Sequence, residues 1–312
     1  MAERLLRGAV AGALLMFEVF AVDPSAIADE ANFGRIVDQC GPRTGRFIAR
    51  CPRKWQDLVL EAAPWKPVQR LRIVDRLRRA TALAVCDVAR DFSAGDWLVE
   101  TEREAELFKA IVALDNPRAH PKVVNRDDLD PDAEPWRVAR ECRVAQTGRA
   151  LAGLLSPLLR CSRELQLVDP YFGPETPRFR KVFEALLTEA ARDGRGLRRC
   201  EVHLTARADE RFFRSSCDSQ LARLIPRGIK VELFRWNELP DGDQFHARYI
   251  VTDLGGVRVD GGLDEKPPGQ QTDVSLLDPD IWHRVRSDFD AGTATFKLVD
   301  RHAVPGRAAK CS

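Results

Sequence analysis

The second half of the chain alternates short apolar strands with amphipathic helices, and this alternation constrains the fold more than any other feature. Residues 165–168, 199–205 and 229–234 form apolar runs of strand length. Between the first two runs, residues 178–192 place apolar side chains at helical spacing, and residues 279–290 predict a later helix before a strand at 295–299. Strands that alternate with helices indicate an α/β fold. We therefore expect residues 137–312 to form a mixed sheet flanked by helices.

The first part of the chain predicts a different architecture. Residues 31–40, 44–51, 55–63, 68–88 and 100–114 carry apolar residues at helical spacing, and only residues 17–22 alternate like a strand. Residues 1–125 are therefore predicted to be a mainly helical domain. Residues 126–136 are acidic and contain prolines, which predicts a linker. A long helix is expected over residues 136–161, after this linker.

Composition excludes several classes of protein. The chain has 312 residues, 44% of them hydrophobic and 31% charged, which is enough for two domains with apolar cores. The net charge of +2 gives no global field that would demand a polyanionic partner. None of the eight cysteines forms a C-x-x-C pair, so we expect reduced thiols in the cytoplasm rather than a disulfide scaffold or a zinc site.

Two segments of the first part leave alternatives open. Residues 1–7 are basic and residues 8–17 are apolar, which imitates a signal peptide, but Glu18 interrupts the run, and Met16 is an alternative start. Residues 35–79 are rich in arginine. These cations either follow nucleic-acid phosphates or form a solvated helix face, since Asp57, Glu61 and Asp75 dilute their charge.

One stretch of the second half carries the residues best suited to phosphate chemistry. His246 and Arg248 are two residues apart, so an extended strand would point both side chains the same way. The imidazole can attack phosphorus or act as a base, and the guanidinium can hold phosphate oxygens with two parallel hydrogen bonds. The stretch continues through a carboxylate, a Gly-rich turn, a glycine pair and a second carboxylate, namely Asp253, Gly255-Gly256, Gly261, Gly262 and Asp264.

This stretch resembles the HKD motif of the phospholipase D superfamily, which reads H-x-K, four residues, Asp, and a Gly-rich run ending in a polar residue. Here Arg248 stands for the lysine and Asp264 for the usual asparagine. In these two details the chain is more similar to the phospholipase-D-like domain that follows the MIT domain of a eukaryotic ESCRT-associated protein. That domain is regarded as a binding module. The resemblance covers about residues 137–300 and implies a phospholipase-D-like fold there.

The resemblance also implies roles for the residues of the motif. His246 would be the nucleophile that forms a phosphohistidine, Arg248 would neutralise the phosphate oxygens, and Asp253 would support the site. Asp264 would lie near the histidine, where it would orient the imidazole but repel a phosphate. Each residue also has a plainer interpretation: His246 as a packed or surface residue, Arg248 as a cross-strand ion-pair partner, and Asp253 as a turn residue.

Asp169 and Tyr171 follow the strand at residues 165–168. Open α/β sheets bind ligands beyond the carboxyl ends of their strands, so we expect both residues to line the same cleft as the motif, with Gly261 and Gly262 also contacting the substrate. The alternative is a helix-entry turn bent by Pro170. His203 lies within a strand among apolar residues and is predicted to pack in the core.

Two functions follow from these observations. The first is a metal-independent phosphodiesterase that acts on nucleic acid. The superfamily uses two histidines and this chain has one such motif, so this reading requires a homodimer with His246 of each chain at the seam. The alternative is a non-catalytic module that binds phosphorylated lipid, nucleic acid or a protein partner, and the arginine and aspartate of the motif favour it. We expect no cofactor and no metal, in a bacterial-type cytoplasmic protein.

Overall fold

The computed structural model describes residues 15–88, 95–130, 132, 134–192, 196–290, 292 and 295–306. The chain divides into two compact units, Met1–Arg140 and Glu141–Ser312. The leader-like residues 1–14 and Cys311 lie outside the described residues. Among the described helices, none has the length and apolar character needed to cross a bilayer.

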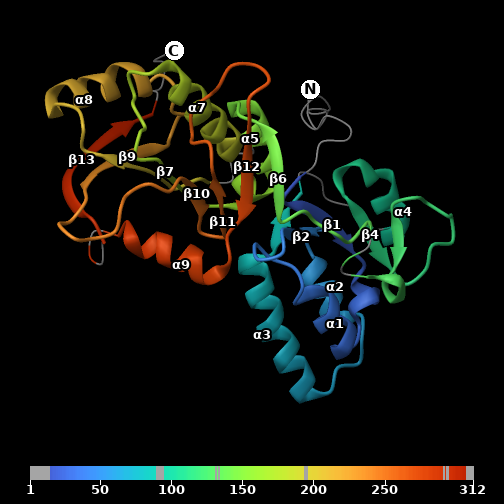
Figure 1. The fold of residues 1–312 in the computed structure, drawn as a ribbon. Helices are drawn as coiled ribbons and strands as arrows, with labels where there is room; N and C mark the ends of the chain where they lie inside the picture. The colour runs from blue at the N-terminus through green and yellow to red at the C-terminus, as the bar shows by residue number, and fades with distance from the viewer. Residues whose placement is uncertain are drawn as a thin grey trace, which may run out of the picture. The chain divides into compact units, whose positions relative to one another are not determined.

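The first unit is built on a five-stranded sheet in which all the paired strands run parallel. The strand order is β3-β2-β1-β4-β5, with β1 at the centre (Figure 1). The strands are β1 (Glu18–Val22), β2 (Arg46–Arg50), β3 (Val85–Asp87), β4 (Ala110–Ala113) and β5 (Val123–Asn125).

Helices cover both faces of this parallel sheet. Phe20 and Val22 of β1 pack with α1 (Glu30–Val37), α2 (Trp55–Glu61) and α3 (Pro67–Leu83) in one apolar cluster. Ala21 points to the other face and packs in a second cluster with residues around α4 (Trp97–Arg103). A parallel sheet covered in this way is the usual α/β arrangement.

The expectation of a mainly helical first domain is therefore wrong. Residues 44–51 contain β2, and residues 100–114 contain the end of α4 followed by β4. Strands buried on both faces consist of short, continuously apolar runs, such as Phe47-Ile48-Ala49, which lack the alternation of a half-buried strand. The strand β1 and the helices α1, α2 and α3 of this unit match the sequence-based expectation to within a few residues.

The segment predicted as a linker packs into the first unit. Trp136 is 2% exposed, and its ring centre lies 4.6 Å from that of Phe20. Arg46 Nε donates to the Trp136 carbonyl at 2.9 Å. The boundary between the units thus follows Arg140, and the proline-containing segment before it closes the core of the first unit instead of separating two domains. Pro131 of this segment is outside the described residues.

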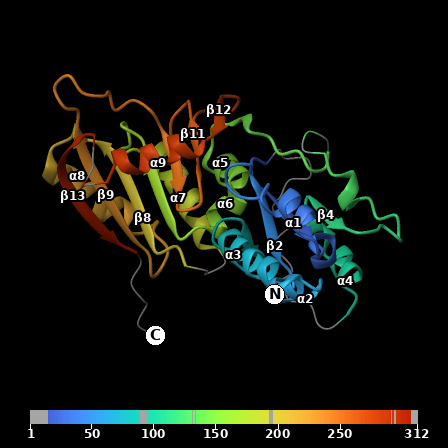
Figure 2. The same cartoon turned by 90° about the horizontal axis from the view of Figure 1, so that it is seen from below.

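The second unit is built on an eight-stranded mixed sheet in the order β13-β9-β8-β7-β10-β11-β12-β6 (Figure 2). Strands β7, β8 and β9 run parallel, and the other neighbouring pairs are antiparallel. The strands are β6 (Glu141–Ala145), β7 (Glu164–Val168), β8 (Arg199–Thr205), β9 (Lys230–Asn237), β10 (Tyr249–Thr252), β11 (Gly256–Val259), β12 (Gln271–Leu276) and β13 (Lys297–Pro305).

Helices lie on both sides of the mixed sheet, so the mixed α/β fold expected for this part is confirmed. Figure 1 shows α5 (Gly148–Leu154) and α7 (Pro177–Ala191) above the sheet and α9 (Pro279–Asp288) below it. The remaining helices are α6 (Ser156–Cys161) and α8 (Glu210–Ser216). Val168, Val251 and Val285 belong to one apolar cluster, which joins α9 to its face of the sheet.

The long helix expected over residues 136–161 is wrong. The segment begins with the edge strand β6 and continues as two short helices, α5 and α6. Thr147 divides them from the strand, because its side chain accepts a hydrogen bond from Ala150 N and caps α5. The strand β12 was also not expected, although it is the only partner of β6. The predictions for β7, β8, α7 and α9 are confirmed to within a few residues.

Candidate functional site

The strand register places His246 and Arg248 at one end of β10 and Asp253 at the other. Tyr249 of β10 is paired with Val168 of β7, so His246 and Arg248 lie at the edge where Asp169 follows β7. Both residues precede the strand, which begins at Tyr249, so strand alternation does not set their directions.

Asp253 lies at the other end of β10 from the histidine. The pairing of Thr252 with Leu165 places it beside the start of β7. There its Oδ1 accepts hydrogen bonds from Arg163 N at 2.8 Å and Glu164 N at 3.1 Å. Asp253 therefore fixes the start of β7, and it is not one of the groups gathered around Arg248.

Two guanidinium groups converge on Tyr171 at the carboxyl end of β7. The Cζ atom of Arg248 lies 5.2 Å from the ring centre, and that of Arg207 lies 4.3 Å from it. Arg207 follows β8, which runs parallel to β7, so the carboxyl ends of both strands deliver residues to one edge. The ring itself is 43% exposed. The arrangement is a half-open aromatic surface with two cations against it.

Neither of these guanidinium groups is neutralised by an ion pair within the described part of the chain. The Nε atom of Arg248 is also buried without a hydrogen-bond partner there. An unpaired buried donor attached to a cation is costly unless a ligand or water satisfies it. At this edge of the sheet, therefore, two guanidinium groups lie close together without an ion pair among the described residues, and the buried carboxylate of Asp169 interacts electrostatically with one of them, Arg248.

Asp169 supports the backbone around this surface. It is 2% exposed, and its carboxylate accepts hydrogen bonds from Tyr171 N at 2.8 Å and Leu263 N at 2.7 Å. Burial raises the pKa of Asp169, and the charge of Asp264 adds to the rise, while the two N–H bonds and Arg248 oppose it. Asp169 thus ties the turn after β7 to the glycine turn and lies behind the tyrosine.

Asp264 is neutralised by its own partners. It is 4% exposed, and its Oδ2 lies 3.2 Å from Arg178 Nε and 2.9 Å from Lys266 Nζ. Within the described residues it makes no contact with His246. The expected repulsion of a phosphate by Asp264 is correspondingly reduced, and so is its expected action on the imidazole.

The glycine pair allows the turn to approach its neighbours closely. A Cβ on Gly261 would lie 2.5 Å from Gln146 Oε1 and 2.9 Å from Thr272 Oγ1. Gly262 has a φ of +96°, and a Cβ there would lie 3.4 Å from Asp169 Oδ2. Both glycines are therefore required by close packing of the turn.

Gln146 holds this turn from the end of β6. Its Nε2 donates to the carbonyl of Gly261 at 2.8 Å and also approaches the carbonyls of Gly262 and Asp264, at 3.3 and 3.2 Å. Neither Gln146 nor Arg207 was expected from the sequence. The position of Arg207 after a strand parallel to β7 was a usable signal, whereas nothing near Gln146 marks it.

His246 is exposed beside this surface. In the described part of the chain, its ring has no hydrogen-bond partner that would fix its orientation or its tautomer. The structure therefore brings Asp169, Tyr171, Arg248, the glycine pair and Asp264 together, leaves His246 at the rim, and separates Asp253.

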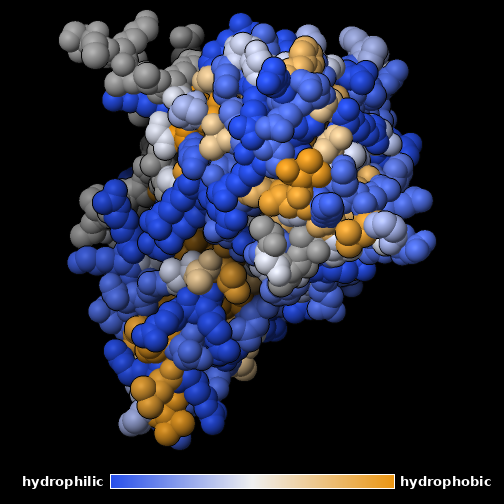
Figure 3. All heavy atoms as spheres, turned by 90° about the vertical axis from the view of Figure 1, so that its left-hand side faces the viewer, coloured by the Kyte–Doolittle hydropathy of each residue, from blue (hydrophilic) through white to orange (hydrophobic). Residues whose placement is uncertain are grey.

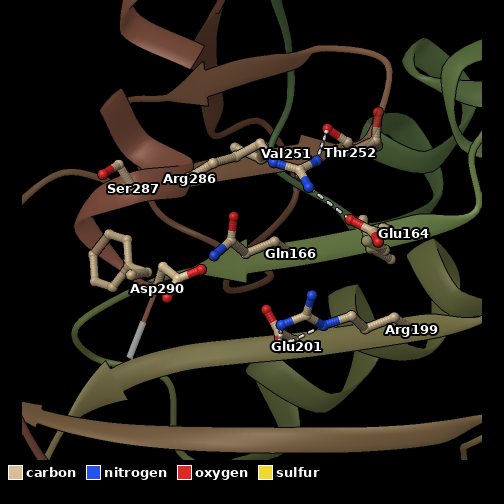
Figure 4. Close-up of a pocket in the computed structure, with 11 residues that line it drawn as sticks. Glu164, Gln166, Arg199, Glu201, Val251, Thr252, Arg286, Ser287 and Asp290 are labelled. Carbon is tan, nitrogen blue, oxygen red and sulfur yellow. Dashed lines mark hydrogen bonds and ion pairs between the residues drawn. The ribbon is translucent and has the colours of Figure 1, made fainter. Parts of the chain in front are cut away.

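A second hollow lies at the opposite end of β7 and β8 (Figure 4). It has a volume of about 270 Å³, and its two arginines are each paired with a glutamate of the lining. Arg199 Nη2 lies 2.6 Å from Glu201 Oε1, and Arg286 Nη2 lies 2.7 Å from Glu164 Oε2. The amide of Gln166 points between the two pairs in Figure 4.

His203 lies 3.0 Å from Gln166, between their Nε2 atoms, and is fully buried, as expected from its position in the strand. Trp236 Nε1 donates to His203 Nδ1 at 3.1 Å, so the remaining proton of the neutral ring is on Nε2. Burial lowers the pKa of His203. This histidine is a neutral member of the core.

Comparisons with known proteins assign no family. No protein-family model and no curated protein matches the chain. A solved archaeal chromatin protein, TrmBL2, described as showing a novel mode of DNA binding, is similar to 55% of this chain at 12% identity and a TM-score of 0.27. The match spans 57% of that protein's chain. A likeness at this score assigns neither a fold family nor a function.

Proposed function

We propose that the second unit is a phospholipase-D-like module that binds a phosphate group at the carboxyl ends of β7 and β8. The observation that carries the proposal is the convergence of Arg207 and Arg248 on Tyr171 without an ion pair among the described residues. A bound phosphate would supply the missing counter-charge.

Guanidinium groups suit this task because their planar N–H donors match phosphate oxygens in pairs. The Nε atom of Arg248 has no hydrogen-bond partner among the described residues but is buried, so the terminal N–H groups of this guanidinium are the ones that would meet the phosphate. The half-exposed Tyr171 contacts both cations and presents an aromatic surface on which a ligand's apolar part can rest. These features support binding of an anion without requiring any chemical step.

Binding is favoured over turnover because the histidine lacks support. A nucleophilic imidazole has to be oriented by a partner, and a second group has to protonate the leaving oxygen. Asp264 is held by Arg178 and Lys266, and Asp253 lies at the opposite end of β10. Neither carboxylate of the motif orients His246.

A metal-independent phosphodiesterase that acts on nucleic acid is the second candidate. It is favoured by the exposure of His246 at the same edge as Arg248, where the ring is free to meet a ligand. Turnover through a phosphohistidine would require a homodimer that supplies the second histidine. The phosphate itself could belong to nucleic acid, to a phosphorylated lipid or to a protein partner.

The proposal is tested by titrating the full chain with inorganic phosphate, phenyl phosphate and bis(p-nitrophenyl) phosphate, using calorimetry. We expect Arg207→Gln and Arg248→Gln each to weaken phosphate binding about tenfold, the loss expected for a charge-assisted hydrogen-bond pair. Arg301→Gln is the matched control, because Arg301 is already paired with Glu232 at 2.6 Å. Equal losses in all three variants, or no binding by the wild type, would contradict the proposal.

The same diester separates the two candidates. Release of p-nitrophenol in EDTA that disappears in His246→Ala supports the phosphodiesterase. Binding that survives in His246→Ala without any release of p-nitrophenol supports the module.

A further inference from the structure

The amino-terminal end of α3, in the first unit, exposes apolar side chains to water. Leu71 is 72% exposed and Val68 is 61% exposed, the highest values among the exposed large apolar residues of the described chain. They are three residues apart in the helix and therefore lie on one face. Figure 3 shows apolar atoms gathered at the lower end of this view, where Figure 1 places this end of α3.

Cations lie close in sequence to these two residues at this end of the helix. Lys66, Arg70 and Arg72 lie in residues 62–74, a segment without Asp or Glu. Arg72 is 3.7 Å from Glu30, at the edge of ion-pair distance. Lys66 and Arg70 have no carboxylate partner within the described residues.

Further along α3, two of the three arginines are paired. Arg76 forms an ion pair with Asp38, and Arg79 Nη2 lies 2.8 Å from Asp75, whereas Arg78 has no ion pair among the described residues. The unpaired cations Lys66 and Arg70 lie within two residues of the exposed apolar pair.

The end of α3 is also rigidly supported. Pro67 begins the helix, and the indole N–H of Trp65 donates to the Val59 carbonyl at 3.3 Å. Ile73 and Leu77 anchor the opposite face of α3 in the core. Val68 and Leu71 therefore cannot turn inward without unwinding the helix, and their exposure is fixed by the fold.

We propose that this end of α3 binds the surface of a bilayer that contains anionic phospholipid, with Val68 and Leu71 inserted between the headgroups and Lys66 and Arg70 beside the lipid phosphates. A lipid interface stabilises both kinds of side chain together, because it offers an apolar layer directly beneath a layer of negative charge. Nucleic acid would satisfy the cations but would leave the aliphatic side chains in water. This surface belongs to the first unit and does not depend on the phosphate site of the second.

The test is sedimentation of the full chain with vesicles of phosphatidylcholine alone and with vesicles that also contain phosphatidylserine. We expect binding only to the anionic vesicles. The double variant Val68→Gln with Leu71→Gln should weaken it at least about tenfold, from the loss of two inserted side chains. Arg70→Gln should weaken it about fivefold.

Leu83→Gln is the matched control. Leu83 is 48% exposed at the other end of the same helix, so this variant should bind within about twofold of the wild type. Circular dichroism of each variant confirms that α3 is retained. The proposal is overturned if the wild type does not bind anionic vesicles, if Leu83→Gln loses as much affinity as the double variant, or if labelled duplex DNA binds to this surface and the double variant still binds vesicles normally.

Discussion

Among the described residues, arginine side chains are paired with carboxylates at the amino ends of strands β7 and β8, but not at their carboxyl ends. At the amino ends, Arg199 is paired with Glu201, and Arg286 is paired with Glu164, around a hollow of about 270 Å³. At the carboxyl ends, the guanidinium of Arg207 lies against Tyr171 without an ion pair among the described residues. The arginines at the first end have carboxylate partners, while Arg207 at the second end has none among the described residues.

The buried carboxylates at the two ends, Asp169 and Glu201, also differ in the direction of their pKa shifts. Burial raises the pKa of Asp169, and its bonds do not fully compensate. Burial also tends to raise the pKa of Glu201, but the hydrogen bond from His203 and the charge of Arg199 outweigh it, so the pKa of Glu201 is lowered. The presence of a hollow is therefore a weaker sign of function than the absence of a partner for a charged group.

The largest expected effect comes from Gly261→Ala, which breaks the carboxyl-end site. The new Cβ would lie 2.5 Å from Gln146 Oε1, so the buried amide that holds the turn would have to move. We expect the free energy of unfolding to fall by about 2 kcal/mol, as for other overpacked positions, with a loss of phosphate binding. Urea unfolding followed by circular dichroism measures this change.

The control for that prediction is Gly153→Ala. Gly153 lies in α5, and a Cβ there would meet nothing within 4 Å. Alanine should therefore leave stability unchanged or raise it by about 0.5 kcal/mol through its helix propensity. A similar loss in both variants would show that the turn has room to accommodate a side chain.

A smaller effect is expected on the free energy of unfolding at acidic pH, where the carboxylates of Glu201 and Asp169 should act in opposite directions. The folded state holds Glu201 ionised below its usual pKa of 4.5, so its contribution to stability is present above that pH and is lost as the pH falls through the lowered value. Glu201→Gln should remove this loss, so the variant's stability should fall less on acidification than that of the wild type.

Asp169 should show the reverse sign. Its pKa is raised from 3.8, so the native state binds a proton more tightly than the unfolded chain, and stability falls as the pH rises through the raised value. Asp169→Asn should abolish that fall, although the amide lowers stability at every pH because it cannot accept both N–H bonds. Urea unfolding midpoints of the wild type and of both variants, measured above and below pH 4.5, give the change of stability with pH that is due to each carboxylate. Two changes of equal sign would contradict the predicted difference between Glu201 and Asp169.

The smallest expected effect is that of Arg286→Gln, which should leave phosphate affinity almost unchanged. Arg286→Gln removes a guanidinium that is already engaged by Glu164 and by the Thr252 carbonyl, at 2.7 and 3.0 Å. Phosphate affinity should therefore stay within about twofold of the wild type by calorimetry. A loss as large as that expected for Arg207→Gln would mean that the amino-end hollow also binds the anion.

The sequence was sufficient for the second unit where its strands and helices carry clear periodicity. The amphipathic pattern of α7 and the apolar runs of β7 and β8 predicted these elements closely. The first unit could not be predicted in the same way, because its strands are short and buried on both faces. A run such as Ala110–Ala113 fits a buried helix as well as a parallel strand.

The candidate site was predicted in part for a similar reason. Asp169, Tyr171 and Arg248 were expected together, because residues beyond the ends of neighbouring strands meet at one edge. The separation of Asp253 depends on the register of β10 against β7, which no local pattern encodes. Arg207 was not predicted as a site residue because its role depends on its contact with Tyr171. This contact joins residues that follow two different strands, and no local sequence pattern marks it.

The position of β6 at the edge of the mixed sheet has a consequence for biosynthesis. On the ribosome, β6 is the first strand of its unit to emerge, yet its only neighbour in the sheet is β12, near the end of the chain. Gln146, which follows β6, likewise forms its hydrogen bond to the Gly261 carbonyl only after the glycine turn has been synthesised. Because such long-range pairing is slow to form, the mixed sheet is completed only after β12 has been synthesised, and a nascent chain that stops short of β12 leaves β6 unpaired.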